Sequence, residues 1–167
     1  AASFVLVAVA GAACAGEGDD RASVPEVDLE ERRAEVLAAE DAMNQAVDGL
    51  DCDAGLAWIA DDAEHLFVGN AVLMRTKPEL TAMCAEMVEP RAGAVFSIDD
   101  RSARMLSETS ALVVREGTYT IDYVDGTSEE LFLVMSSVWE RDAEGWKMVH
   151  LHESYMERGD EPGWRPG

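Results

Sequence analysis

Two histidines lie two residues apart near the C-terminal end of the chain, within the strand-like run 146–156. Successive side chains of a strand point to opposite faces, so the pattern puts His150 and His152 on one face together with Trp146. Two imidazoles on one face can hydrogen-bond a ligand or act as acid and base. His65, on another predicted strand, is a further catalytic candidate. The structural alternative is that these histidines bond to neighbouring strands or lie in a dimer interface.

Paired histidines also bind metals, but the rest of a metal site is missing from this sequence. The chain has three histidines in all, and no carboxylate has an obvious ligand spacing to them. It also lacks a phosphate-binding loop, a dinucleotide fingerprint and a nucleophile elbow. We therefore expect neither a metal ion nor a cofactor.

A second group of candidate residues alternates along the predicted strand 111–123. Arg115, Gly117, Tyr119 and Tyr123 share one face of that strand. If this face lines a cavity, Arg115 can hold a ligand carboxylate and Tyr119 can donate a hydrogen bond. The alternative is an aromatic cross-strand cluster with Arg115 at its rim.

The composition limits the partners. The 167 residues suffice for one domain with a sizeable core, and the formal net charge is −21. Such a charge repels phosphate, so we expect no nucleic-acid partner and no binding to an anionic membrane surface.

The first thirteen residues form an apolar run with the length of the hydrophobic part of a signal peptide. This run is followed by Cys14 and a polar, flexible segment, and the boundary resembles a bacterial lipobox with Gly11 in place of a larger apolar residue. We expect an exported bacterial protein, either a lipoprotein anchored through Cys14 or a periplasmic or extracellular protein. Ordinary signal-peptidase cleavage is the alternative to lipidation, after Ala10, Ala12 or Ala15.

Two cysteines remain when Cys14 is set aside. Cys52 and Cys84 are an even pair in a compartment that permits disulfides. Two buried free thiols are the alternative.

The chain alternates between helical and strand patterns in a segregated order. After a flexible linker at 15–27, Asp28 and Glu31 form a capping box that opens a helix running to Gly49. The expected elements then are a helix at 53–60, short strands at 64–68 and 71–75, a helix from Thr76 to Glu89, long strands at 94–105, 111–123, 129–141 and 146–156, and a disordered tail at 157–167. Asp125-Gly126 predicts a tight hairpin turn, and Asp99-Asp100 a bulge. This order predicts an α+β domain.

Two segments carry a family resemblance. The hairpin that contains Trp139, Trp146, His150 and His152 resembles the closing hairpin of nuclear transport factor 2-like domains, in particular SnoaL-like domains and the association domain of calcium/calmodulin-dependent kinase. The segment 59–69 resembles the "ADDA…G" segment of that superfamily. The resemblance covers residues 28–156 and implies a cone of three helices on a curved, mostly antiparallel sheet.

The resemblance also implies a pocket inside the cone. The second face of the sheet is apolar as well and needs a cover, so we expect a homodimer packed sheet to sheet. Where the ketosteroid isomerase branch has its general-base aspartate, this chain has Phe67, or Leu66 if the register slips by one residue. Where the kinase domain has a pocket arginine, this chain has Ser137. The expected ligand-binding residues are His150, His152, Tyr119, Arg115, Trp58 and Phe67.

Three functions follow as hypotheses. The first is a dimer that binds a small, mostly apolar molecule in its conical cavity. The second is an isomerase, cyclase or hydrolase that uses pocket histidines or tyrosine, and the third is a protein–protein association module. The missing aspartate counts against the second hypothesis, and the sequence leaves open whether the protein is an enzyme.

Overall fold

The computed structural model describes residues 27–64 and 66–157. Four parts of the chain lie outside the described residues. They are the predicted signal segment 1–14 with Cys14, residues 15–26 of the predicted linker, the single residue His65, and the tail from residue 158. The predictions made for them therefore stay predictions.

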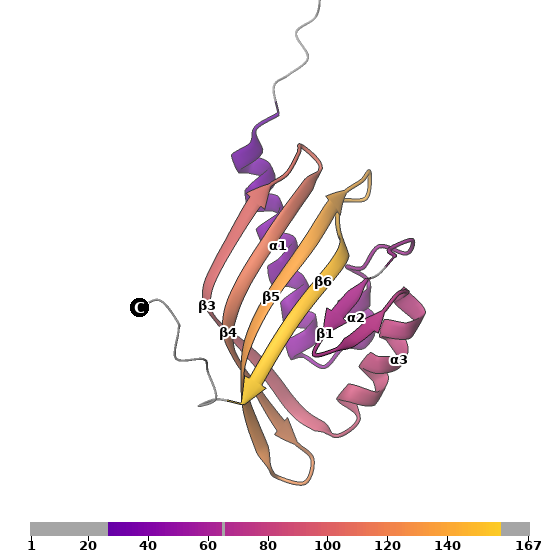
Figure 1. Ribbon diagram of the computed structural model, residues 1–167, viewed down its shortest axis with the longest axis vertical. Helices are drawn as coiled ribbons and strands as arrows, with labels where there is room; N and C mark the ends of the chain where they lie inside the picture. Colours follow the sequence, from indigo (N-terminus) through magenta and orange to yellow (C-terminus); the bar gives the residue numbers. More distant parts are fainter. Residues whose placement is uncertain (1–26, 65, 158–167) are drawn as a thin grey trace, which may run out of the picture.

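Within the described residues, three helices pack against one curved sheet of six strands (Figure 1). The helices are α1 (Leu29–Asp48), α2 (Cys52–Leu56) and α3 (Lys77–Val88). The strands are β1 (Phe67–Gly69), β2 (Val72–Met74), β3 (Arg91–Met105), β4 (Ser110–Tyr123), β5 (Ser128–Arg141) and β6 (Trp146–Glu157). They are ordered β2-β1-β6-β5-β4-β3, and only the β1–β6 pair is parallel. The predicted α+β class is confirmed.

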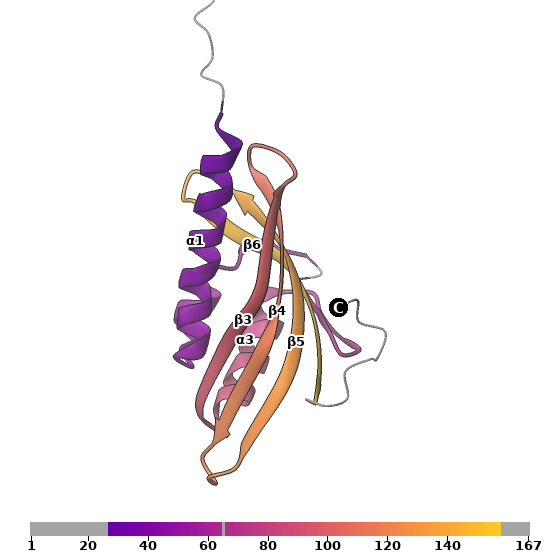
Figure 2. The same cartoon turned by 90° about the vertical axis from the view of Figure 1, so that its left-hand side faces the viewer.

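The long helix α1 crosses the inner face of the sheet, which is the face turned toward the helices (Figure 2). It begins as the capping pattern predicts, because Asp28 Oδ1 accepts hydrogen bonds from the backbone N–H groups of Glu30 (2.9 Å) and Glu31 (3.4 Å). Its buried face presents Val36, Ala39, Glu40 and Met43 to the sheet. A glutamate in this apolar face has to be paired, which makes it a first indication of a site.

The hairpin turn and the bulge lie where the sequence predicts them. Gly126 has φ +86°, and Tyr123 N donates to Thr127 O at 2.9 Å across the turn. The β3–β4 register shifts between Ile98 and Asp100. Beside this bulge the two strands approach closely at Gly117, where a Cβ would lie 2.1 Å from a backbone oxygen of β3. Only glycine fits this position of β4.

A second bulge, in β6, was not predicted and changes which residues face inward. Val138 pairs with His150, but the next residue of β5, Trp139, pairs with Met148, so Val149 is an extra residue in β6. The simple alternation that put His150 and His152 on the face of Trp146 is therefore wrong beyond Met148. Trp146 and Met148 are buried in the core, whereas the two histidines lie on the outer face.

The helices α2 and α3 close one side of the sheet. The helix α2 ends at Leu56, four residues before the predicted end, and α3 begins after the N-cap Thr76, whose hydroxyl accepts from Glu79 N. A disulfide joins Cys52 of α2 to Cys84 of α3, with the two Cα atoms 6.0 Å apart. No helix in the described part of the chain is long and apolar enough to span a bilayer.

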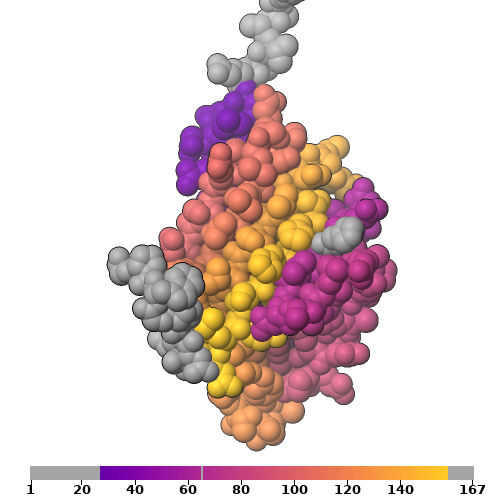
Figure 3. All heavy atoms as spheres, viewed as in Figure 1, coloured from indigo at the N-terminus to yellow at the C-terminus, as the bar shows by residue number. Residues whose placement is uncertain are grey.

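None of the helices in the described residues lies over the outer face of the sheet (Figure 3). Val95, Val114 and Val134 are exposed on this face, beside the polar side chains of His152 and Ser154. The outer face thus carries apolar groups as the sequence indicates, and no helix or strand that the structure describes covers them.

Candidate functional site

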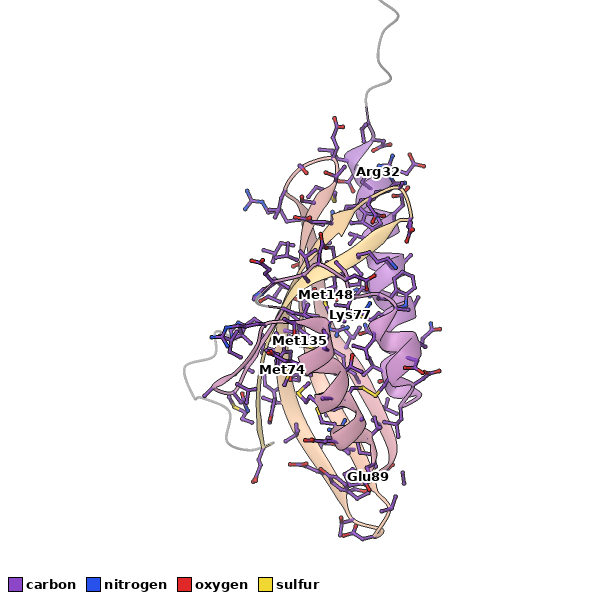
Figure 4. All side chains as sticks on the ribbon, turned by 90° about the vertical axis from the view of Figure 1, so that its right-hand side faces the viewer. Arg32, Met74, Lys77, Glu89, Met135 and Met148 are labelled. Carbon is purple, nitrogen blue, oxygen red and sulfur yellow. A yellow bond between two sulfur atoms is a disulfide. The ribbon has the colours of Figure 1, made fainter. Side chains whose placement is uncertain are left out.

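A cavity of about 470 Å³ lies between the inner face of the sheet and the helices. Most of its wall is apolar. The apolar lining residues include Met43, Val47, Leu56, Ile59, Phe67, Leu80, Met83, Met87, Phe96, Ile121, Leu131, Leu133, Met135, Met148 and Leu151. Met135 and Met148 are seen in the interior between the sheet and the helices in Figure 4. Such a wall suits a ligand whose surface is mainly hydrocarbon.

The disulfide forms part of this wall, since Cys52 and Cys84 both line the cavity. The disulfide joins α2 to α3, the two helices that close one side of the sheet. Leu80 is the one buried residue of α3, so few apolar contacts hold this helix. The covalent link therefore contributes directly to the position of one cavity wall.

Arg115 is the most buried charged group on the sheet side of the cavity, with 5% of its surface exposed. Its Nη1 lies 3.6 Å from Glu40 Oε1, its Nη2 lies 3.1 Å from Met135 Sδ, and its guanidinium carbon lies 4.8 Å from the centre of the Phe96 ring. Burial lowers the pKa of Arg115 and raises the pKa of Glu40, and the ion pair between them opposes both effects. An arginine keeps its charge in a protein, so the cavity contains a desolvated cation.

The polar groups opposite Arg115 come from one stripe of α1. Glu40, Asn44 and Asp48 follow one another at intervals of four residues and therefore share a helix face. Asp48 Oδ1 accepts from the backbone N–H of Phe96 at 3.0 Å, and its burial raises its pKa. Asn44 Nδ2 is buried without a hydrogen-bond partner among the described residues.

Glu153 enters the cavity wall from β6 because of the bulge at Val149. It pairs across the sheet with Met135, and Met135 pairs with Arg115, so the Cα atoms of Glu153 and Arg115 are about 10 Å apart. Burial raises the pKa of Glu153 to about 7, although the positive charges of Arg115 and, to a smaller extent, Arg91 act to lower it. A carboxyl group with this pKa exchanges its proton near neutral pH, which suits a general acid or base.

Two tyrosines line the end of the cavity nearest the β4–β5 turn. Arg91 Nη1 donates to the Tyr119 hydroxyl at 3.0 Å, and the Tyr123 hydroxyl donates to Glu129 Oε2 at 2.7 Å. Because Tyr119 accepts from Arg91, its own O–H proton is free to point at a ligand. Burial raises the pKa of Tyr119, so this proton is retained at neutral pH.

The structure brings three of the predicted site residues together. Arg115, Tyr119 and Phe67 line the cavity, and Arg115 is enclosed rather than at the rim of an aromatic cluster. Trp58 is half-buried against the core and is not part of the cavity wall. Whether the three lining residues bind a ligand stays a prediction.

Of the predicted histidines, the two that the structure describes do not lie in the cavity. His150 and His152 are on the outer face, and His152 is exposed beside Val68 of β1. The reason is the bulge at Val149, which exchanges the faces of all later residues of β6. Among the described residues, no group of three His, Cys, Asp or Glu side chains has the arrangement of a metal site.

The sequence did not predict Glu40, which pairs with Arg115, or the cavity-lining residues Asn44, Asp48 and Glu153. Glu40, Asn44 and Asp48 had a sequence signal that could have found them, because polar residues at four-residue spacing lie beside the apolar stripe of an amphipathic helix. Glu153 had none, because simple alternation assigns it to the opposite face.

The sequence from residue 36 to 157, which includes the whole sheet and most of α1, matches the family model of the SnoaL-like domain. The chain belongs to the SnoaL-like family. The match contains Arg115, Glu153 and the α1 stripe, so the cavity groups lie within the SnoaL-like domain itself. No curated protein sequence matches the chain significantly.

Solved structures of low sequence identity share the fold. A nuclear transport factor 2-like superfamily protein from Salmonella enterica is 14% identical with a TM-score of 0.68, over 84% of this chain and 100% of that one. A ketosteroid isomerase-like protein from Erwinia carotovora is 20% identical with a TM-score of 0.65, over 76% and 98%. A hexachlorocyclohexane dehydrochlorinase from Novosphingobium barchaimii is 14% identical with a TM-score of 0.64, over 83% and 97%. At these identities the likeness shows that the SnoaL-like chain has the nuclear transport factor 2-like fold.

Proposed function

We propose that this SnoaL-like domain binds a small, mostly apolar molecule in the cavity of its cone. The observation that carries the proposal is the cavity itself, about 470 Å³ in volume, with an apolar wall and a few inward polar groups. This volume is typical of small-molecule sites, and the combination of apolar wall and few polar groups gives both affinity and orientation.

A direct test uses native mass spectrometry of the mature protein, followed by mass measurement after denaturation. We expect an additional small mass that is lost on denaturation. Met83→Trp places an indole in the cavity and should abolish the additional mass, whereas Glu86→Trp puts the same group on the exposed side of α3 and should retain it. A wild-type protein that shows no additional mass and no thermal stabilisation by any member of a small-molecule library would contradict the proposal.

Proton-transfer catalysis is the second candidate function, and Glu153 is the observation that favours it. Its raised pKa gives it the acid–base role that the sequence had suggested for the histidines, with Tyr119 as a hydrogen-bond donor. Two proteins of similar fold are described as a dehydrochlorinase and as ketosteroid isomerase-like. Incubation of the identified ligand in D2O should introduce deuterium with the wild type and not with Glu153→Gln.

Two further parts of the proposal concern the whole protein. A homodimer packed through the outer face would cover Val114 and Val134, which this chain leaves exposed. Export with lipidation at Cys14 would place the domain at a bacterial membrane surface through an acyl anchor. Sedimentation at micromolar concentration tests the dimer, and the mass of the N-terminal peptide from an exporting bacterial host tests the acylation. A purely structural association module remains the alternative if the cavity binds nothing.

A further inference from the structure

The second half of α3 is held in place mainly by one covalent bond. Leu80 is the one buried residue of this helix, and Cys84, one turn later, is joined to Cys52 of α2. Met83 is half-buried beside the core, and in the described part of the chain no side chain from residue 82 to 88 forms a hydrogen bond or an ion pair. Few noncovalent contacts therefore oppose an outward movement of this segment.

Both ends of the segment are fixed by other bonds. Before it, Lys77 Nζ donates to Ile59 O at 3.0 Å (Lys77 is labelled in Figure 4). After it, Val124 N donates to Pro90 O at 2.9 Å, which ties the chain to the β4–β5 turn. The part of α3 between these two anchors can therefore move while the rest of the fold stays in place.

The other end of the disulfide is bound firmly to the sheet. Directly after α2, Met148 N of β6 donates to Trp58 O at 2.8 Å, and Ala60 N donates to Met148 O at 3.0 Å. Leu56, the last residue of α2, is buried. The disulfide thus joins a weakly held part of α3 to a well-held part of the core.

The face of α3 that carries the disulfide is also the face that closes the cavity. The lining residues of α3 are spaced three and four apart, as on one face of a helix, and they are Leu80, Met83, Cys84, Met87 and Val88. Cys52 and Cys84 are both half-buried, so the bond between them is not sealed in the core. A movement of this face away from the sheet removes one wall of the cavity.

We infer that the Cys52–Cys84 disulfide is a redox latch: its reduction by a dithiol releases residues 81–88 of α3 and opens the cavity, and the reverse exchange with a disulfide closes it again. In the forward direction, a thiolate of the dithiol attacks one sulfur, and the other cysteine leaves as a thiolate that takes up a proton. The second thiol of the dithiol then displaces the first cysteine. The protein gains two electrons and two protons, and the dithiol becomes a disulfide. Only the consequence for ligand binding rests on the proposed function of the cavity.

Hydrogen exchange measured by mass spectrometry follows the helix itself, in the full chain before and after reduction with dithiothreitol. We expect the backbone amides of residues 81–88 to exchange about tenfold faster, or more, after reduction, because this segment buries little surface. The amides of α1 and β4 should remain protected over the same labelling time. The variant with both Cys52→Ala and Cys84→Ala should show the fast exchange of α3 with and without dithiothreitol.

Binding of Nile red, a neutral apolar dye, follows the cavity. A fluorescence titration gives its Kd for the oxidised chain, the reduced chain and the variant without the two cysteines. Reduction should raise the Kd about tenfold, because the open cavity has lost the α3 wall. The variant should bind as weakly as the reduced chain, and dithiothreitol should not change its Kd.

The two measurements separate the latch from the function of the cavity. If reduction leaves the exchange of α3 unchanged, or if α1 and β4 lose protection to the same extent as α3, the latch is refuted. Released α3 with equal or tighter binding of Nile red would refute the opening of the cavity. Released α3 without binding of Nile red by either form would support the release and count against the proposed function.

Discussion

Replacing Glu153 by glutamine should stabilise the protein at alkaline pH and have much less effect in mild acid. The carboxyl has a pKa of about 7 in the folded protein, against 4.5 for an exposed glutamate. The folded state therefore keeps this proton more readily than the unfolded chain does. The stabilising contribution of Glu153 is complete below pH 4.5, is lost as the pH rises toward 7, and stays lost above that.

The size of the effect follows from the two pKa values. The gap between 4.5 and about 7 corresponds to about 3 kcal/mol, at about 1.4 kcal/mol for each pH unit. Glutamine imitates the neutral form, so Glu153→Gln should exceed the wild type in free energy of unfolding by about 1 kcal/mol at pH 5. This difference should grow to about 3 kcal/mol at pH 8.5.

Urea unfolding followed by tryptophan fluorescence at four pH values between 5 and 8.5 measures this difference. Glu157→Gln removes the same charge at the exposed end of β6 and should give a difference that varies little with pH. If the curves of Glu153→Gln and the wild type run parallel from pH 5 to 8.5, Glu153 titrates like an exposed glutamate. Its proposed role as an acid or base at neutral pH would then be refuted.

Three other perturbations test the rest of the site. Arg115→Met removes one of the two arginines that face the buried Glu40 and leaves only Arg101, so it should cost about 3 kcal/mol, and adding Glu40→Leu should recover a large part of it in a double-mutant cycle measured by urea unfolding. Replacing both Cys52 and Cys84 by alanine opens a loop with a sequence separation of 32 residues and should cost about 4 kcal/mol, so dithiothreitol should destabilise the wild type and leave the variant unchanged. Gly117→Ala would place a Cβ 2.1 Å from the backbone of β3, and we expect a fall in Tm much larger than that produced by an alanine at Gly126, where nothing lies within 4 Å.

Much of the fold was predictable because it depends on short-range patterns. The cap at Asp28, the turn at Gly126 and the bulge near Asp100 are each encoded within a few neighbouring residues. The spacing of the apolar residues distinguishes helices from strands, because it repeats every three to four residues in a helix and every two in a strand. These local signals determine the order of the elements, and the order is typical of the fold.

The candidate site was predictable only in part. Simple alternation places Arg115 and Tyr119 on one face of β4, and in the structure both residues line the cavity. The residues that face them, Glu40 and Asn44, belong to a helix far away in the sequence. Only the packing of α1 across the sheet brings them to the arginine.

The sequence by itself determined the α+β class, the element order, the family and the presence of charged and aromatic side chains on β4. The tertiary structure alone decided which face of β6 turns inward. One extra residue at Val149 moves His152 to the outer face and Glu153 into the cavity. The physical reason is that the face of a strand residue depends on its register against its neighbour. That register depends on how β5 and β6 pair along their whole length, and no short pattern within β6 contains this information.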